Sequence, residues 1–433
     1  MRKIYYILII VLLSSIISEN YAQNNYYGKL GYGFSPEGQP YDYDSIAPFL
    51  QEVANTCDGG VVFANSNWRD SINSSGLIPG LQKLVCLAQP MPYGYADMIN
   101  FAWASYPTLY LDVPGDATNN WTNVTAKNLF LQMLINAADS LKPTYFFIGN
   151  EISTYWAQDS ADYINWMSFY NQAYDSIKVH SPSSKVGTTF NYEHLTGNGT
   201  FVGFTTPYWN AFNALDTSKI DILGLTVYPF FKYPHANSVP ANYLEPIFNR
   251  MGNKPIAITE TGWPGDSVIG AWYASSAEQV DYVNTLFSMI SGKNVEVVNW
   301  LFLNYLMDTS NTAEMLLFKS VALRDSLGND RPALPIWLSY CDNATRIENT
   351  TAMQQTDVIV YPNPFSSTTT IEIKYNMQNA SLVVYNLFGE IVAYLNNLNG
   401  NIIKVDRNNL SHGVYFFQVT ENDKIFAGKL IIE

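Results

Sequence analysis

Short apolar segments recur along most of the chain, from Gly28 to Tyr340, and they alternate with longer stretches of helical periodicity. The short segments are rich in β-branched and aromatic residues, a composition that favours buried strands. The longer stretches repeat apolar residues every three or four positions, as residues 124–141 and 276–292 illustrate. This alternation predicts parallel strands joined by crossover helices.

Eight segments are predicted to be strands, which is the number that closes a (β/α)8 barrel of the TIM type. They are residues 28–34, 59–64, 107–113, 144–150, 185–190, 220–228, 255–260 and 296–303. The predicted helices include residues 45–56, 124–141, 160–179, 241–251 and 276–292. Residues 83–88 are ambiguous, and we predict a helix because the apolar positions from Leu77 to Ala88 follow a helical stripe.

The first residues carry the features of a secretory signal peptide. Arg2 and Lys3 precede an apolar run over residues 4–17, and the small residue Ala22 follows it. A membrane-spanning helix needs about 20 apolar residues, so this run is short for an anchor. We therefore predict a signal peptide at residues 1–22 and a secreted or cell-surface protein.

The composition and the periodicity of the sequence change after Tyr340. We predict a barrel domain at residues 23–340, a polar linker at residues 341–356 and a second domain at residues 357–433. The second domain shows short segments with period-two alternation and tight turns, which is typical of a small antiparallel β-sandwich.

Composition restricts the partners. The chain has 37 Asp and Glu residues against 23 Lys and Arg, a net charge of -14, which disfavours nucleic acid and anionic lipid. Aromatic residues make up 15% of the chain and charged residues 14%, a balance suited to stacking on neutral sugar rings. Three cysteines allow one disulfide, whose pairing the sequence leaves open. We expect a monomer.

Two carboxylates stand at predicted strand ends. The fourth predicted strand runs into Asn150 and Glu151, and the seventh delivers Glu260. A parallel barrel brings these ends to one mouth, where active sites form. Two facing carboxylates can cleave a glycosidic bond. One strand-end glutamate alone would indicate a cap or an ion pair, but the pair, flanked by Asn150 and Trp263, favours catalysis.

These strand ends resemble clan A glycoside hydrolases, which are retaining barrel enzymes. Residues 258–264 (ITETGWP) and 225–231 (LTVYPFF) resemble segments of glycoside hydrolase family 17, whereas residues 149–152 (GNEI) also fit a β-1,4-galactanase of family 53. The resemblance implies a polysaccharide substrate, with β-1,3-glucan as the first expectation. It implies that Glu151 is the acid/base and Glu260 the nucleophile. It also implies that Asn150 donates to the sugar 2-hydroxyl and that Tyr228 lies beside the nucleophile and positions it.

Aromatic side chains near strand ends are candidates for sugar stacking. We expect Trp263 and Trp300 to be the main platforms because each lies near a predicted catalytic carboxylate; Trp68, Trp156 and Trp272 are further candidates. The four histidines form no His-x-His or His-Glu-x-x-His pattern, so we predict no metal centre. No phosphate-binding glycine-rich loop is evident, and no nucleotide cofactor is implied.

The C-terminal segment carries a second resemblance. Residues 360–365 (VYPNPF), 384–389 (VYNLFG) and 413–416 (GVYF) are similar to the type IX secretion sorting domain of Bacteroidota. The resemblance implies export by the type IX secretion machinery. The alternatives are a carbohydrate-binding β-sandwich at this end and, for the whole chain, a non-catalytic sugar-binding barrel at the cell surface.

Overall fold

The structure is a computed structural model of the 433-residue chain. It describes residues 26–341 and 358–433, apart from residues 27, 38–42, 58, 70–75, 90–92, 106–107, 110, 114, 201–202, 268–273, 308–311, 387–390, 409 and 422–423. The predicted signal peptide and residues 342–356 of the predicted linker lie outside the described residues.

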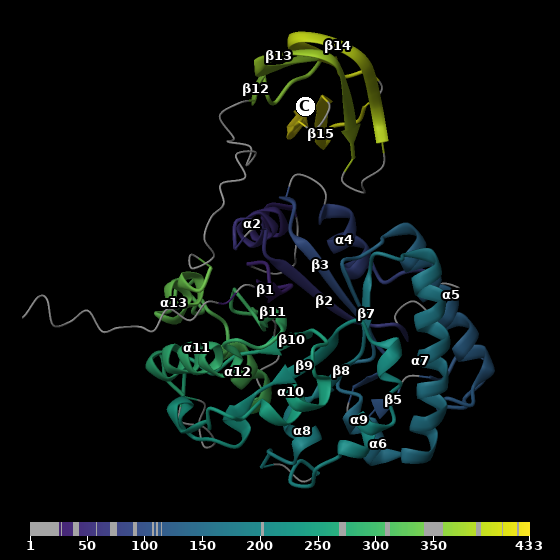
Figure 1. Ribbon diagram of the computed structural model, residues 1–433. Coiled ribbons are helices and arrows are strands. Elements are labelled where there is room, and N and C mark those ends of the chain that lie inside the picture. The colour runs from purple at the N-terminus through teal and green to yellow at the C-terminus, as the bar shows by residue number, and fades with distance from the viewer. Residues whose placement is uncertain are drawn as a thin grey trace, which may run out of the picture.

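The first part of the chain forms a parallel barrel surrounded by helices (Figure 1). Its hydrogen-bonded strand order is β7-β6-β3-β2-β1-β11-β10-β9-β8. The strand bounds are β1 (Lys29–Gly33), β2 (Val61–Asn67), β3 (Ala96–Ala102), β6 (Tyr145–Ile148), β7 (Lys185–Gly187), β8 (Thr189–Asn191), β9 (Leu223–Val227), β10 (Ile256–Thr261) and β11 (Val295–Trp300). The predicted TIM-type fold is confirmed.

The two ends of this sheet are halves of one strand. Only Thr188 separates β7 from β8, and the backbone bonds Asp221 N to Val186 O (2.9 Å) and Gly224 N to Thr188 O (3.0 Å) close the ring. The backbones approach so closely that a Cβ on Gly187 would lie 1.9 Å from the Ile222 carbonyl oxygen. Glycine is therefore required at the closing position.

Helices follow most of the strands and cover the outer face of the barrel (Figure 1). The longer ones are α2 (Tyr43–Ala54), α4 (Gly80–Ala88), α5 (Val124–Ser140), α7 (Ser160–His180), α10 (Glu245–Met251), α11 (Ser276–Ile290), α12 (Ala313–Ser320) and α13 (Ala333–Ser339). Asn123, Asp159 and Ser275 accept backbone N–H groups at the starts of α5, α7 and α11, as N-caps do. Shorter helices in the strand-end loops are α6 (Ser153–Gln158), α8 (Tyr192–Thr196) and α9 (Trp209–Asn213).

The third barrel strand is not the predicted one. Residues 96–102 form it, whereas within residues 107–113 the structure shows only β5 (Thr108–Leu109), paired with β4 (Ala104–Ser105), and an isolated bridge at Val113. Two polar residues interrupt the apolar pattern of β3. Asp97 accepts from Thr144 N (2.8 Å) and from its hydroxyl (2.7 Å), so a carboxylate is used to fix the neighbouring strand. The ambiguous residues 83–88 lie in α4, as predicted.

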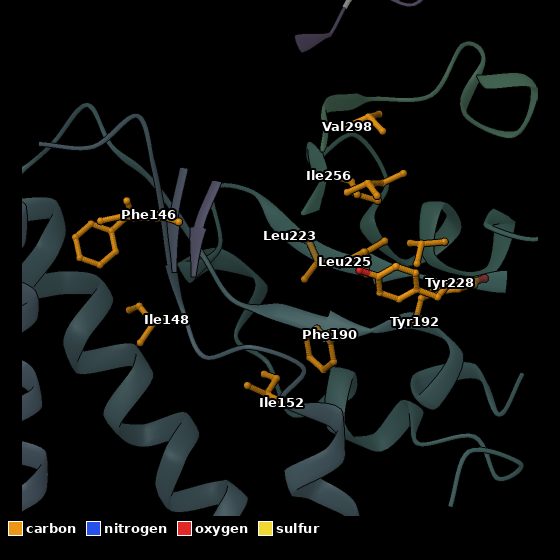
Figure 2. Packing of buried hydrophobic residues seen from close by; sticks show 14 of the residues in the cluster. Phe146, Ile148, Ile152, Phe190, Tyr192, Leu223, Leu225, Tyr228, Ile256 and Val298 are labelled. Atoms are coloured by element: carbon orange, nitrogen blue, oxygen red, sulfur yellow. The ribbon is translucent and has the colours of Figure 1, made fainter. Parts of the chain in front are cut away.

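Side chains alternate between two apolar layers. Val61, Met98, Phe147, Ile222 and Val297 belong to the cluster that fills the barrel interior. Their neighbours in the chain pack outward in a second, larger cluster, part of which Figure 2 shows. At the carboxyl ends of the strands the inward positions include the polar residues Thr226 and Glu260.

Residues 358–433 form a five-stranded antiparallel sheet with its own core. The strands are β12 (Val358–Tyr361), β13 (Thr368–Tyr385), β14 (Ile391–Asp406), β15 (Gly413–Glu421) and β16 (Lys424–Ile432). Four of the predicted short strands are merged in β13 and β14, whose pairing carries register shifts between residues 372 and 380 that bend these strands around the core.

A disulfide joins Cys57, which follows α2, to Cys341, which follows α13. Their sequence separation is 284 residues, so the bond links the beginning of the barrel to its last described residue. Cys86 is buried and unpaired with another cysteine. No helix in the described part of the chain has the length and apolar character needed to cross a membrane.

Candidate active site

Glu151 is presented by a sharp turn at the end of β6. Gly149 has φ +88° and Glu151 has φ +53°, the left-handed region that costs a non-glycine residue about 1–2 kcal/mol. The turn is fixed by backbone bonds from Gly149 N to Phe101 O (2.9 Å) and from Ile152 N to Thr189 O (3.0 Å). Strain of this kind persists where the surrounding structure enforces it, as at functional sites.

Two donors hold the carboxylate of Glu151. Asn191 Nδ2, at the end of β8, donates to Oε1 at 3.0 Å, and the Thr226 hydroxyl, on β9, donates to the same oxygen at 2.7 Å. Burial raises the pKa of Glu151 above its ordinary value, while these two hydrogen bonds lower it. The carboxyl therefore sits where its proton is retained more easily than in water.

A β-bulge turns Glu260 into the barrel. Along β10, Ile258 aligns with Leu225 of β9, but Glu260 rather than residue 259 aligns with Thr226. Aligned residues of neighbouring strands share a face, so Glu260 faces inward like Thr226, which contacts Glu151. Without the extra residue, period-two alternation would place Glu260 outside with Ile256 and Ile258.

Two donors also hold Glu260. The Tyr228 hydroxyl donates to Oε2 at 3.2 Å, and the Asn150 side chain forms a second hydrogen bond. Burial raises the pKa of Glu260 to about 8, the charge of Glu151 adds to the rise, and the two hydrogen bonds oppose it. Burial also keeps the Tyr228 phenol protonated, since its pKa lies well above its ordinary value. The two carboxyls are thus electrostatically coupled, and the charge of one favours the protonated form of the other.

A polar cavity of about 210 Å³ lies on the Glu151 side of the pair. Its walls come from the ends of β2 and β3 and from the turn after β6. The lining residues are Asn65, Ser66, Asn67, Ala102, Ala104, Asn150, Glu151 and Thr154. Amides and hydroxyls dominate this wall, and they are suited to the hydroxyl groups of a neutral sugar.

The structure brings four of the predicted site residues together: Asn150, Glu151, Tyr228 and Glu260. It corrects the predictions for Trp263 and Trp300, which are both fully buried. Trp300 lies two residues after Val298, on the same outer face of β11, and packs against Trp337 of α13. Its Nε1 donates to Val321 O at 2.8 Å. A ring without exposed surface offers no face to a sugar.

Trp263 packs between Phe230 and Tyr282, at centroid distances of 6.0 Å and 5.3 Å. Among the further candidates, Trp68 is buried against Phe130, and Trp156 is half-buried beside Tyr163. Trp272 lies outside the described residues.

Three residues that contact the site were missed. Asn191 and Thr226 hold Glu151, and Glu193 is a further carboxylate beside them that is fully buried. Asn191 and Glu193 follow the predicted fifth strand directly, so the same rule that selected Glu151 and Glu260 applies to them. Thr226 had no such signal because a threonine inside a strand is ordinary.

A parallel barrel with two coupled, half-buried glutamates at the carboxyl ends of its strands is the architecture of a glycoside hydrolase. Comparison with known families agrees: residues 107–301, which include both glutamates, match Glycosyl hydrolase family 53. Residues 359–433 match the Secretion system C-terminal sorting domain. Residues 107–301 therefore resemble the catalytic domain of a glycoside hydrolase, and the sorting domain indicates export through the type IX secretion system. A comparison with curated proteins returns no match.

Two solved structures, a mannosidase and a GH5_18 protein, show the same fold. An exo-beta-1,4-mannosidase of Opitutaceae bacterium strain TAV5 is 14% identical with a TM-score of 0.53, over 74% of this chain and 61% of that one. A GH5_18 protein of Bifidobacterium longum is 12% identical with a TM-score of 0.54, over 74% and 79%. Beta-glucuronidase 2 of Bacteroides uniformis is 11% identical with a TM-score of 0.47, and the chain spans 45% of its length.

The expected closeness to family 17 is not supported, because the family that matches is family 53. The two segments that suggested family 17 cover only the ends of β9 and β10, whereas the family 53 match extends over residues 107–301. The expectation of β-1,3-glucan as the substrate rested on family 17, so it is not supported either.

Proposed function

We propose that this enzyme is a retaining endo-β-glycanase whose substrate is a neutral polysaccharide of the β-1,4-galactan class. The observation that carries the proposal is the coupled pair of half-buried glutamates, Glu151 and Glu260, each held by two neutral donors. The substrate class is supported by the match to family 53 and by the amide-rich cavity beside Glu151. We expect it to act as a monomer on glycans outside the cell.

Glu260 is the proposed nucleophile. Tyr228 and Asn150 donate to its carboxylate, which favours the ionised form that attack requires. In the resting site the pair shares one proton. The positive charge that develops on the sugar ring in the transition state favours the anion of Glu260 there, so Glu151 holds the shared proton as the glycosidic bond breaks.

Glu151 is the proposed acid/base because it lines the polar cavity that would receive the leaving sugar. Glu260 forms a bond to the anomeric carbon as the glycosidic C–O bond breaks, and the leaving oxygen takes the proton of Glu151. Glu151 then removes a proton from water, which displaces Glu260 and releases the second sugar with the original anomeric configuration. Asn150, next to Glu151 and bonded to Glu260, is the proposed donor to the sugar 2-hydroxyl.

The test is reducing-sugar release from β-1,4-galactan, β-1,3-glucan, mannan and xylan, with the anomer formed first identified by NMR. We expect activity on β-1,4-galactan with retention, and a loss of about 10³-fold or more in kcat for Glu260→Gln. Glu245→Gln is the control, because Glu245 is an exposed partner of Lys293. Undiminished activity in Glu260→Gln, or an inverted product, would refute the assignment.

A further inference from the structure

Glu193 is a fully buried carboxylate that the proposed reaction does not use. It lies in α8, directly after β8. Its Oε1 accepts the backbone N–H of Tyr228 at 2.9 Å and the hydroxyl of Tyr243 at 2.8 Å. Its Oε2 is buried and has no hydrogen-bond partner among the described residues. A buried oxygen left without a partner is costly, which calls for an explanation beyond packing.

The contacts of Glu193 lead to both catalytic carboxyls. Tyr228, whose backbone it holds, donates its hydroxyl to Glu260. Asn191, two residues earlier, donates to Glu151 and caps α8 by accepting His194 N at 2.9 Å. One rigid segment of the chain therefore sets the positions of a donor to each glutamate.

The charges around Glu193 are negative or neutral. The titratable groups that interact with it are Glu151 from the end of β6, Tyr228 from the end of β9, Tyr243 ahead of α10, Tyr282 from α11 and Tyr192 in its own helix. No salt bridge of the described residues involves Glu151, Glu193 or Glu260. One buried and two half-buried carboxyls without a paired cation do not all ionise together.

Burial raises the pKa of Glu193 to about 7, and the charge of Glu151 adds to the rise. The hydrogen bonds from Tyr228 and Tyr243 oppose it. Because Oε1 accepts both bonds, Oε2 is the oxygen left to carry the proton. Its charge therefore changes in the pH range where the catalytic pair also titrates.

We propose that Glu193 is a positioning residue: its carboxyl fixes Tyr228 against Glu260, and its charge sets the pH at which the catalytic pair gives up its proton. The inference rests on the proposed roles of Glu151 and Glu260. Ionisation of Glu193 disfavours a second negative charge nearby, so it helps the acid keep its proton as the pH rises.

The kinetic test compares Glu193→Gln with Glu193→Ala in the full-length enzyme. Glutamine keeps an acceptor for the Tyr228 backbone N–H but removes the charge, so kcat near pH 6 should stay within about threefold of that of the unmodified enzyme. The alkaline limb of the kcat/KM profile should move to lower pH by about half a pH unit. Alanine removes the acceptor, and kcat should fall about tenfold or more with less change in KM. Glu245→Gln, which also removes one carboxylate charge but at a residue that pairs with Lys293, is the matched control.

A second measurement needs no substrate. Difference infrared spectroscopy follows the carbonyl band of protonated carboxyls as the pH is raised, and Glu193→Gln should delete one group that titrates near pH 7. Superimposable pH profiles for Glu193→Gln and the unmodified enzyme would overturn the proposal, as would an unchanged infrared titration. If the unmodified protein hydrolyses no β-glycan, the proposed function fails, and the infrared result still decides whether Glu193 carries the proton.

Discussion

Glu151 and Glu260 differ in what surrounds them. Glu151 borders the polar cavity and is held by Asn191 and Thr226, whereas Glu260 does not line that cavity and is held by Tyr228 and Asn150. Two carboxyls in different environments are what an acid/base and a nucleophile require.

The difference gives a prediction for Glu151→Ala. Loss of the acid removes the proton needed by a poor leaving group, so polysaccharide hydrolysis should fall by about 10²–10⁴-fold. An aryl glycoside with a good leaving group needs little protonation and should lose far less in its first step. Burst kinetics with both substrates measure this, and equal losses on the two would argue against the acid role.

The raised pKa values of Glu260 and Glu193 also give a prediction about stability. The pKa of Glu260 is raised to about 8 and that of Glu193 to about 7, so the folded state binds more protons than the unfolded chain above pH ~4.5. Stability from these groups is present below that pH and is lost as the pH rises toward 8. The thermal unfolding midpoint should decrease as the pH is raised from about 5 to about 8. Glu260→Gln should make this dependence of the midpoint on pH less steep. A slope unaffected by Glu260→Gln would contradict this reading.

At the scale of elements, the turn after β6 is the most constrained part of the site. A Cβ on Gly149 would lie 2.6 Å from Trp103 Nε1 and 2.7 Å from Ile152 Cγ2, at a φ of +88°. Gly149→Ala should therefore cost about 2 kcal/mol or more and displace Asn150 and Glu151, with loss of activity. Gly80→Ala is the control, since a Cβ on Gly80 would meet nothing within 4 Å. Equal unfolding midpoints and activities for the two variants would count against the argument.

The elements also show what the sequence predicts and what it does not. Seven of the eight predicted barrel strands are found because apolar, β-branched runs mark a strand buried on both faces. β3 was missed because Asp97 and Asn100 face polar partners, which no local pattern reveals. Glu260 was chosen by its place at a strand end, yet it faces inward only through the bulge at residues 258–260. The prediction for Trp300 was wrong because side chains alternate between the two faces of a strand, and Trp300 lies on the outer face with Val298.

At the scale of the whole molecule, the barrel is closed twice: by the hydrogen bonds around Gly187 and by the disulfide between Cys57 and Cys341. A bond across 284 residues restricts the unfolded chain strongly. The double variant Cys57→Ser/Cys341→Ser should lose about 2–5 kcal/mol of unfolding free energy. Chemical denaturation measures the loss, and reduction of the unmodified protein should reproduce it; an unchanged midpoint would show that the bond is absent in solution.

The position of that disulfide has a mechanical consequence. The sorting domain follows Cys341 in the chain, so any force that the exporter applies to this domain reaches the barrel at that residue. The covalent bond passes the load to Cys57, behind α2, instead of leaving it on the packing of α13. The disulfide thereby keeps α13 attached to the barrel when force is applied to the sorting domain.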